Sequence, residues 1–192
     1  MSLGGVHSFF LKISTPPFIA LMTVATALLF WLIQFRGGVP GVVRIDGLLR
    51  IGLPDMMLTY SPGTIYQRLV AFGEHGRFAY GLFLERVDFL FPALYGLFFV
   101  SVTTRGLSRL VPDRPALQKL SLLPLAVTFF DWAENVCFLA MLGNYPQESI
   151  RLEKIANLFT LAKWLFALLS IALLLAALVG LARRTTHETR TV

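Results

Sequence analysis

Two carboxylates and an amide lie inside a segment that is otherwise apolar. In the sequence FFDWAENVCF, Asp131, Glu134 and Asn135 interrupt a run that is long enough to cross a membrane. With Thr128 they are spaced i, i+3, i+6 and i+7, so in a helix they share one face. Ionisable side chains inside a membrane are costly and are typical of pathways for protons, ions or substrates. This polar face is therefore the first candidate for chemistry.

A lysine in the last apolar segment is the predicted partner of these acids. Lys163 follows Asn157 and Thr160, and at 1.5 Å per residue it lies roughly 12 Å below the outer end of its segment. Asp131 and Glu134 lie at a similar depth. A buried lysine without a partner is costly, and so is either carboxylate. We therefore predict that Lys163 pairs with Asp131 or Glu134.

The second apolar segment adds a third polar face. Asp88, Pro92 and Tyr95 recur on roughly one side of a helix, and Arg77 and Tyr80 precede them on that side. Because Pro92 has no N–H, the carbonyl of Asp88 loses its helical hydrogen bond. Asp88 is therefore expected to offer a carboxylate and a free backbone acceptor at the same place.

The predicted cluster contains more acid than base. Asp88, Asp131 and Glu134 face Lys163, with Arg77 reaching in from the outer side. We expect that one carboxyl is protonated near neutral pH, or that a cation or basic ligand is bound. The candidate ligand-binding residues are Asp131, Glu134, Asn135, Lys163, Asp88, Tyr95, Arg77 and Tyr80, and the milder groups Thr23, Ala27, Phe30 and Gln34 could complete the lining. No catalytic residue is assigned.

Long apolar segments must position these polar faces. Of the 192 residues, 56% are hydrophobic and 15% charged, and the mean hydropathy is +0.69. A soluble domain is nearer half apolar and a quarter charged. The sequence therefore predicts an all-α fold, a polytopic membrane protein whose residues 1–192 form a single transmembrane domain. Its four-transmembrane-helix bundle has spans at about residues 17–35, 87–104, 120–143 and 155–181.

The loop between the first two spans, residues 36–86, is too patterned for a plain linker. Ser61 and Pro62 predict the start of a helix, and Gly73 predicts its end. Apolar residues recur along one side of this segment. We expect an extra short amphipathic helix that lies at the outer membrane surface, as a lid or a brace.

Basic residues in short loops predict the orientation of the spans. The loop between spans two and three and the tail (residues 182–192) should face the cytoplasm, because they carry Arg105, Arg109, Arg114, Lys119, Arg183, Arg184 and Arg190. With four spans, both the N- and C-termini are then cytoplasmic. A bacterial inner (plasma) membrane is the simplest location.

Several classes of function are disfavoured. The net charge of +6 comes from basic residues at the ends of apolar runs, which does not fit a nucleic-acid partner. The single cysteine, Cys137, excludes an internal disulfide and a CxxC centre. The three histidines lie outside the apolar runs, which argues against haem or a di-iron site. No cofactor and no metal site are predicted.

Three functions remain open from the sequence. The first is binding or transport of a proton, a cation or a small amphipathic molecule, for which a homodimer or larger complex would be needed. The second is a membrane enzyme that transfers protons on a lipid-soluble substrate, as an isomerase does, and this requires a lateral opening. The third is a non-catalytic subunit or assembly factor of a larger membrane complex. The alternative to all three is a purely structural role, in which polar residues hold the helices together.

Overall fold

The computed structural model describes residues 2–188, with side chains described through residue 182. Four helical segments are long and apolar enough to cross a membrane: Pro16–Arg36, Thr64–Leu110, Pro115–Asn144 and Ile150–Ala182. Each of them contains one of the four predicted spans. The side chains of Arg183, Arg184 and Arg190, on which part of the predicted orientation rests, lie outside the described part.

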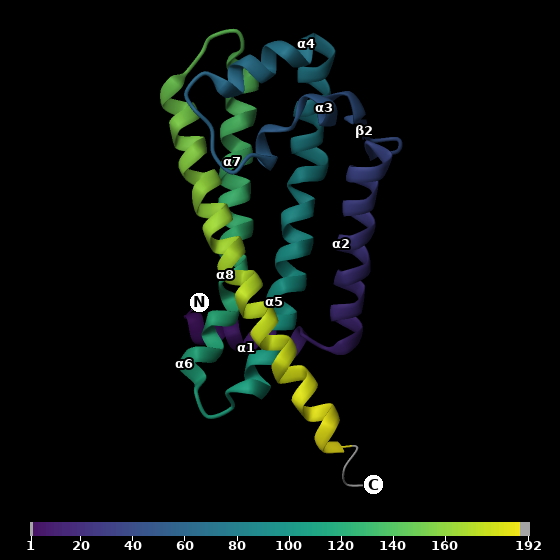
Figure 1. Ribbon diagram of the computed structural model, residues 1–192, viewed down its shortest axis with the longest axis vertical. Helices are drawn as coiled ribbons and strands as arrows, with labels where there is room; N and C mark the ends of the chain where they lie inside the picture. Colours follow the sequence, from purple (N-terminus) through teal and green to yellow (C-terminus); the bar gives the residue numbers. More distant parts are fainter. Residues whose placement is uncertain (1, 189–192) are drawn as a thin grey trace.

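Residues 2–188 are helical apart from one short hairpin and the connections between elements (Figure 1). The α-helices are α1 Leu3–Ile13, α2 Pro16–Arg36, α3 Asp46–Ile51, α4 Thr64–Phe83, α5 Leu90–Leu110, α6 Pro115–Gln118, α7 Pro124–Asn144 and α8 Ile150–Glu188. The strands β1 Gly38–Val39 and β2 Val43–Arg44 pair antiparallel. Two 3₁₀ turns, η1 Pro54–Met56 and η3 Lys119–Leu122, and a π-helical turn, η2 Leu84–Asp88, complete the elements.

Helices α5, α7 and α8 form the packed centre of the bundle, and α2 lies along α5 (Figure 1). Small residues permit the crossing of α5 and α8. A Cβ atom at Gly106 would meet Ala177, and one at Gly180 would meet the carbonyl of Gly106. Glycine and alanine commonly allow membrane helices to approach each other this closely.

Helix α4 is broken at Gly73, whose φ of 65° and ψ of −177° are not helical. Residues 64–72 lie across one end of the bundle, and the chain then turns at Gly73 into the direction of α5 (Figure 1). The predicted start at Ser61 and Pro62 is wrong, because α4 begins at Thr64 after Gly63, which has a φ of 89°. Whether residues 64–72 rest on a membrane surface stays a prediction.

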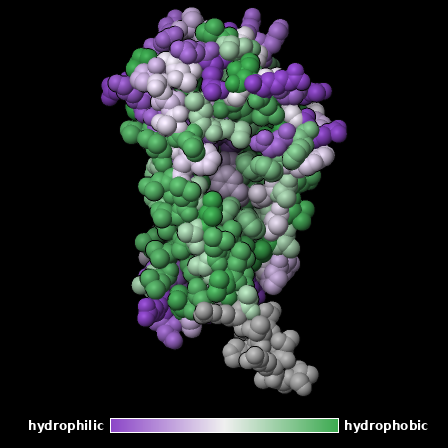
Figure 2. Space-filling model, in the orientation of Figure 1, coloured by the Kyte–Doolittle hydropathy of each residue, from purple (hydrophilic) through white to green (hydrophobic). Residues whose placement is uncertain are grey.

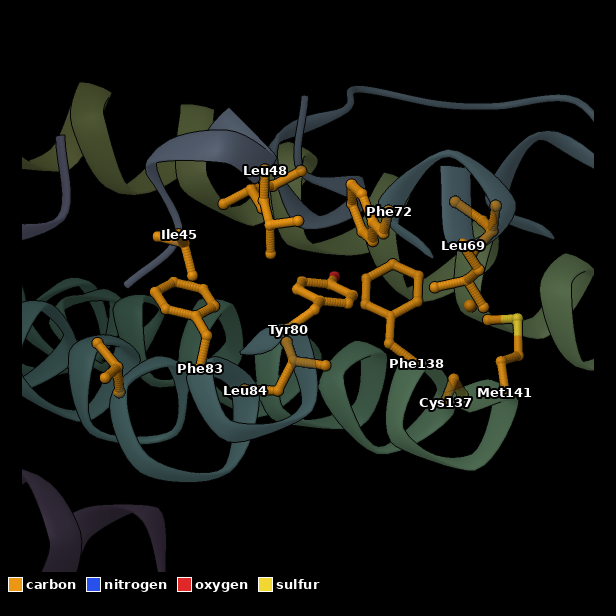
Figure 3. Packing of buried hydrophobic residues seen from close by; sticks show 14 of the residues in the cluster. Ile45, Leu48, Leu69, Phe72, Tyr80, Phe83, Leu84, Cys137, Phe138 and Met141 are labelled. Carbon is orange, nitrogen blue, oxygen red and sulfur yellow. The ribbon is translucent and has the colours of Figure 1, made fainter. Parts of the chain in front are cut away.

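The largest apolar core lies at the end of the bundle covered by the segment between α2 and α4. Tyr80 packs beside Phe83 and Phe138, with Phe72 against its ring at a centroid distance of 5.4 Å (Figure 3). Leu48 of α3 packs against the same cluster. The segment between α2 and α4 is therefore held on the bundle by buried apolar contacts.

The surface divides into three zones. On the face shown in Figure 2, hydrophobic residues cover most of the middle of the molecule, and hydrophilic residues gather toward its two ends. Large apolar side chains of α2 and α8, such as Val24, Leu168 and Leu175, are mostly exposed. A belt of exposed apolar side chains is the pattern expected of a surface that faces lipid.

Candidate functional site

Lys163 of α8 joins the two carboxylates of α7. Its Nζ atom forms ion pairs with Glu134 Oε2 and, at 3.6 Å, with Asp131 Oδ1. It also donates to the backbone carbonyl of Asp55 at 2.9 Å. Lys163, Asp131 and Glu134 are all buried. The predicted pairing is confirmed, and Lys163 contacts both acids rather than one.

A hydrogen-bonded chain extends from this ion pair in two directions. Tyr95 of α5 donates from its hydroxyl to Asp131 Oδ2 at 2.5 Å. On the other side, the hydroxyl of Thr160 donates to Glu134. The chain therefore runs from α5 through α7 to α8.

Side chains of α7 satisfy backbone carbonyls near the proline of α5. Asn135 Nδ2 donates to the carbonyl of Asp88 at 3.0 Å, which is the acceptor that Pro92 was expected to free. The hydroxyl of Thr128 donates to the carbonyl of Pro92 at 2.8 Å. A Cβ atom at Gly96 would meet that hydroxyl, so glycine is needed for this close approach. Thr128 and the Nδ2 atom of Asn135 thus serve helix packing, whereas Asn135 Oδ1 is buried without a hydrogen-bond partner among the described residues.

Asp88 differs from the other acids because part of its carboxylate has no partner. The side chain is 6% exposed, and its Oδ2 atom makes no hydrogen bond to any residue that the structure describes. Buried carboxylate oxygens are normally hydrogen-bonded, and an exception requires an explanation.

Asp55 belongs to the site but was missed from the sequence. It lies in η1, which folds back against the bundle, and its carboxylate accepts a hydrogen bond from the Tyr80 hydroxyl at 3.3 Å. Burial raises the pKa of the Asp55 carboxyl, while the nearby Lys163 ammonium acts in the opposite direction. An acid between apolar residues, in the sequence LPDMM, was the available signal.

Arg77 is not brought into the cluster. Its guanidinium donates to the carbonyl of Leu69 at 3.0 Å and lies 4.0 Å from the centre of the Tyr145 ring. Tyr80, predicted beside it, does point inward and reaches Asp55. The predicted contribution of Arg77 to the charge balance is therefore not seen.

A cavity of ≈510 Å³ lies between α2, α5, α7 and α8, below η1. Its ionisable side chains gather at one end, which we call the acid end: Asp55, Asp88, Tyr95, Asp131 and Lys163. Elsewhere the walls are mainly apolar and include the four expected residues Thr23, Ala27, Phe30 and Gln34 of α2. Figure 2 shows a hollow in this face of the molecule, surrounded by hydrophobic residues.

Two hydroxyls lie farther along the cavity from the acid end. Thr26 of α2 and Ser170 of α8 line it, and their hydroxyl oxygens are buried and have no hydrogen-bond partner among the described residues. Ser170 follows Lys163 by seven residues, which corresponds to about 10 Å along a helix. The cavity is therefore elongated along α8.

A second polar group on α8, which we call the α8 ladder, consists of Glu153, Asn157 and Thr160. Glu153 accepts hydrogen bonds from the backbone N–H groups of Gly63 at 2.5 Å and Ile65 at 2.7 Å, so it caps the start of α4. Asn157 Oδ1 accepts from the N–H of Tyr60 at 3.2 Å. The ladder fastens the segment before α4 to the bundle.

Among residues 2–188, no group of three or more His, Cys, Asp or Glu side chains is placed to hold a metal ion. The acids of the acid end come from separate elements and surround an open volume.

Comparison with known proteins adds no assignment. No protein-family model, no curated protein and no solved structure matches the chain. The geometry of the cavity and its acid end is therefore the basis for function.

Proposed function

We propose that this is a multi-pass membrane protein that binds a small amphipathic, lipid-soluble molecule in the cavity. The observation that carries the proposal is the separation of the lining into an acid end and apolar walls. Ligand sites are typically apolar pockets of a few hundred cubic ångströms with a few polar groups that fix orientation. The acid end would hold the polar group of the ligand, and the walls would hold its apolar body.

The proposed ligand enters from the lipid between α2 and α8. Helix α2 packs along α5, while the cavity lies between α2 and α8. Ala27 of α2 and Ala167 of α8 are small lining residues on these two helices. A side entrance suits a molecule that partitions into membranes.

The proposed orientation puts the acid end in the outer half of a bacterial inner membrane. The loop with Arg105, Arg109, Arg114 and Lys119 is then cytoplasmic, as are both termini. The segment between α2 and α4 faces the opposite side.

One observation favours a second candidate, proton-transfer catalysis on a lipid-soluble substrate. Tyr95 and Asp131 are joined by a 2.5 Å hydrogen bond, and both line the cavity. A carboxylate and a phenol in a site with little water can remove and return a proton, as an isomerase requires. Tyr95→Phe separates the candidates. The ligand stays bound to this variant in both cases, and only an enzyme has a turnover that the variant loses.

The test of the proposal is mass spectrometry of what co-purifies with the protein. Wild type and Ala167→Trp are purified in the same mild detergent, and bound small molecules are identified from the intact complex and after extraction. Ala167 lines the cavity, so tryptophan there should exclude the ligand. Leu168→Trp is the matched control, because Leu168 is 65% exposed on the same helix.

We expect a bound molecule in wild type and in Leu168→Trp, and none in Ala167→Trp. Equal amounts in all three proteins would contradict a cavity site. A stoichiometric protein partner in place of a small molecule would favour the subunit or assembly-factor alternative.

A further inference from the structure

The acid end holds more negative than positive groups. Asp55, Asp88 and Asp131 line the cavity, and Glu134 lies directly behind Lys163. Lys163 is the only Lys or Arg side chain in the described lining of this cavity. With all four carboxyls ionised, the formal balance is four negative charges against one positive charge.

Lys163 has little capacity left for a ligand. Its ammonium already contacts Glu134, Asp131 and the carbonyl of Asp55, and an ammonium has three N–H donors. An anionic ligand would therefore meet carboxylates without a free cation to pair with. The acid end is poorly suited to phosphate, sulfate or carboxylate groups.

Asp88 gives independent evidence that the site lacks a hydrogen-bond donor. Its carboxylate is buried and lines the cavity, and Oδ2 has no partner among the described residues. Asn135 Nδ2 already donates to the backbone carbonyl of Asp88. Oδ2 is therefore a buried oxygen beside the cavity that lacks a hydrogen-bond donor among the described residues.

The shape of the site favours an organic cation over a bare ion. The cavity is ≈510 Å³ and its walls beyond the acid end are mainly apolar. No described group of three acidic, His or Cys side chains is arranged to hold a metal. An ammonium group carries both the charge and the N–H donors that the carboxylates require.

We propose that the ligand is a lipid-soluble amine, whose protonated nitrogen lies between Asp88 and Asp131 and whose apolar body extends toward Ser170. This inference rests on the proposed function and specifies its ligand class. Charge-assisted hydrogen bonds to buried carboxylates are the recognition element.

The test uses four ten-carbon probes on the full-length protein in detergent: decylamine, decyltrimethylammonium, decanol and decanoate. Equilibrium binding of radiolabelled probes is measured on wild type and Asp88→Asn. Ala167→Trp is the control for partition into the micelle. We expect decylamine to bind wild type at least tenfold more tightly than decanol, with decanoate weakest.

Two comparisons isolate the amine nitrogen. Decyltrimethylammonium keeps the charge without N–H donors, so it should bind wild type more weakly than decylamine. This comparison needs no variant, so it stands even if Asp88→Asn folds poorly. In Asp88→Asn the affinity for decylamine should fall at least tenfold, while the affinity for decanol should be unchanged.

The outcomes separate the two proposals. Decanol or decanoate binding as tightly as decylamine, with all binding lost in Ala167→Trp, would overturn the amine ligand and leave the cavity site standing. Binding of every probe that is the same in wild type and Ala167→Trp would overturn the cavity site itself.

Discussion

The α8 ladder and the acid end are neighbouring polar regions that satisfy their polar atoms differently. In the ladder, Glu153 is 1% exposed and both of its carboxylate oxygens accept backbone N–H groups. At the acid end, Asp88 is also buried, but its Oδ2 atom has no partner among the described residues. Lys163 lies where the two regions meet.

This difference indicates which polar residues serve the fold. A buried polar atom with an internal partner contributes to stability, and its removal leaves the partner unsatisfied. A buried polar atom without a partner costs free energy, so it is expected where a ligand completes the site. The ladder and the ion pair of Lys163 thus follow the structural reading of polar membrane residues, and Asp88 does not. The predictions below test this contrast, from the largest expected effect on stability to the smallest.

Lys163→Met should destabilise the protein most. It leaves Glu134 and Asp131 without their cation, and breaking a buried ion pair from one side costs about 3–5 kcal/mol. The free energy of unfolding in SDS–detergent mixtures measures this loss. Lys154→Met is the matched control, because Lys154 is exposed on the same helix. Equal stability of the two variants would mean that the ion pair does not hold α7 and α8 together.

Glu153→Ala should come second, with a loss of about 1–3 kcal/mol, because it removes the acceptor of the N–H groups of Gly63 and Ile65. Glu153→Gln keeps one acceptor oxygen and should lie between wild type and alanine. The segment before α4 should become more sensitive to protease in both variants. The exposed Glu148→Ala is the control. Unchanged melting and digestion in Glu153→Ala would contradict the capping role.

Thr128→Val should have a smaller effect. It removes the hydrogen bond from the threonine hydroxyl to the carbonyl of Pro92 and keeps the side-chain volume. Interhelical hydrogen bonds of this kind contribute on average about 0.6 kcal/mol. The measurement is again the free energy of unfolding, with Thr23→Val as the control, since the Thr23 hydroxyl bonds only to Ile19 of its own helix. A loss as large as that of Glu153→Ala would mean that this contact carries more of the fold than proposed.

Asp88→Asn should leave the melting temperature unchanged or raise it. The amide keeps the volume of the side chain and replaces a buried carboxyl group whose Oδ2 atom has no partner among the described residues. The hydrogen bond from Asn135 ends on the backbone of Asp88 and is retained. Asp113→Asn, at an exposed position, gives the baseline. A fall in the melting temperature that matches Glu153→Ala would place Asp88 with the ladder.

Much of the fold is encoded locally and could be predicted. The four long helices follow from the length of each apolar run. The pairing of Lys163 with Asp131 and Glu134 followed from depth, since both helices rise 1.5 Å per residue and run in opposite directions. The freed carbonyl of Asp88 followed from the missing N–H of Pro92.

The sequence predictions that were wrong or incomplete concern contacts between segments that are far apart along the chain. Asp55 joins the site only because η1 folds back onto the bundle, which no local pattern specifies. The helical face drawn from Asp88 back to Arg77 is interrupted by the π-helical turn η2, because a π turn has a different period from an α turn. The start of α4 is set by a cap from Glu153, nearly ninety residues away along the chain, instead of by Ser61.

The central claim is that Asp88 of the acid end binds a ligand while Glu153 of the α8 ladder supports the fold. The most direct measurement is the melting temperature and the decylamine affinity of Asp88→Asn and Glu153→Gln, taken on the same preparations. We expect Asp88→Asn to keep its melting temperature and lose at least tenfold in affinity, and Glu153→Gln to melt lower and, when folded, to keep its affinity. Stability and affinity that fall together in both variants would contradict the distinction between the two regions.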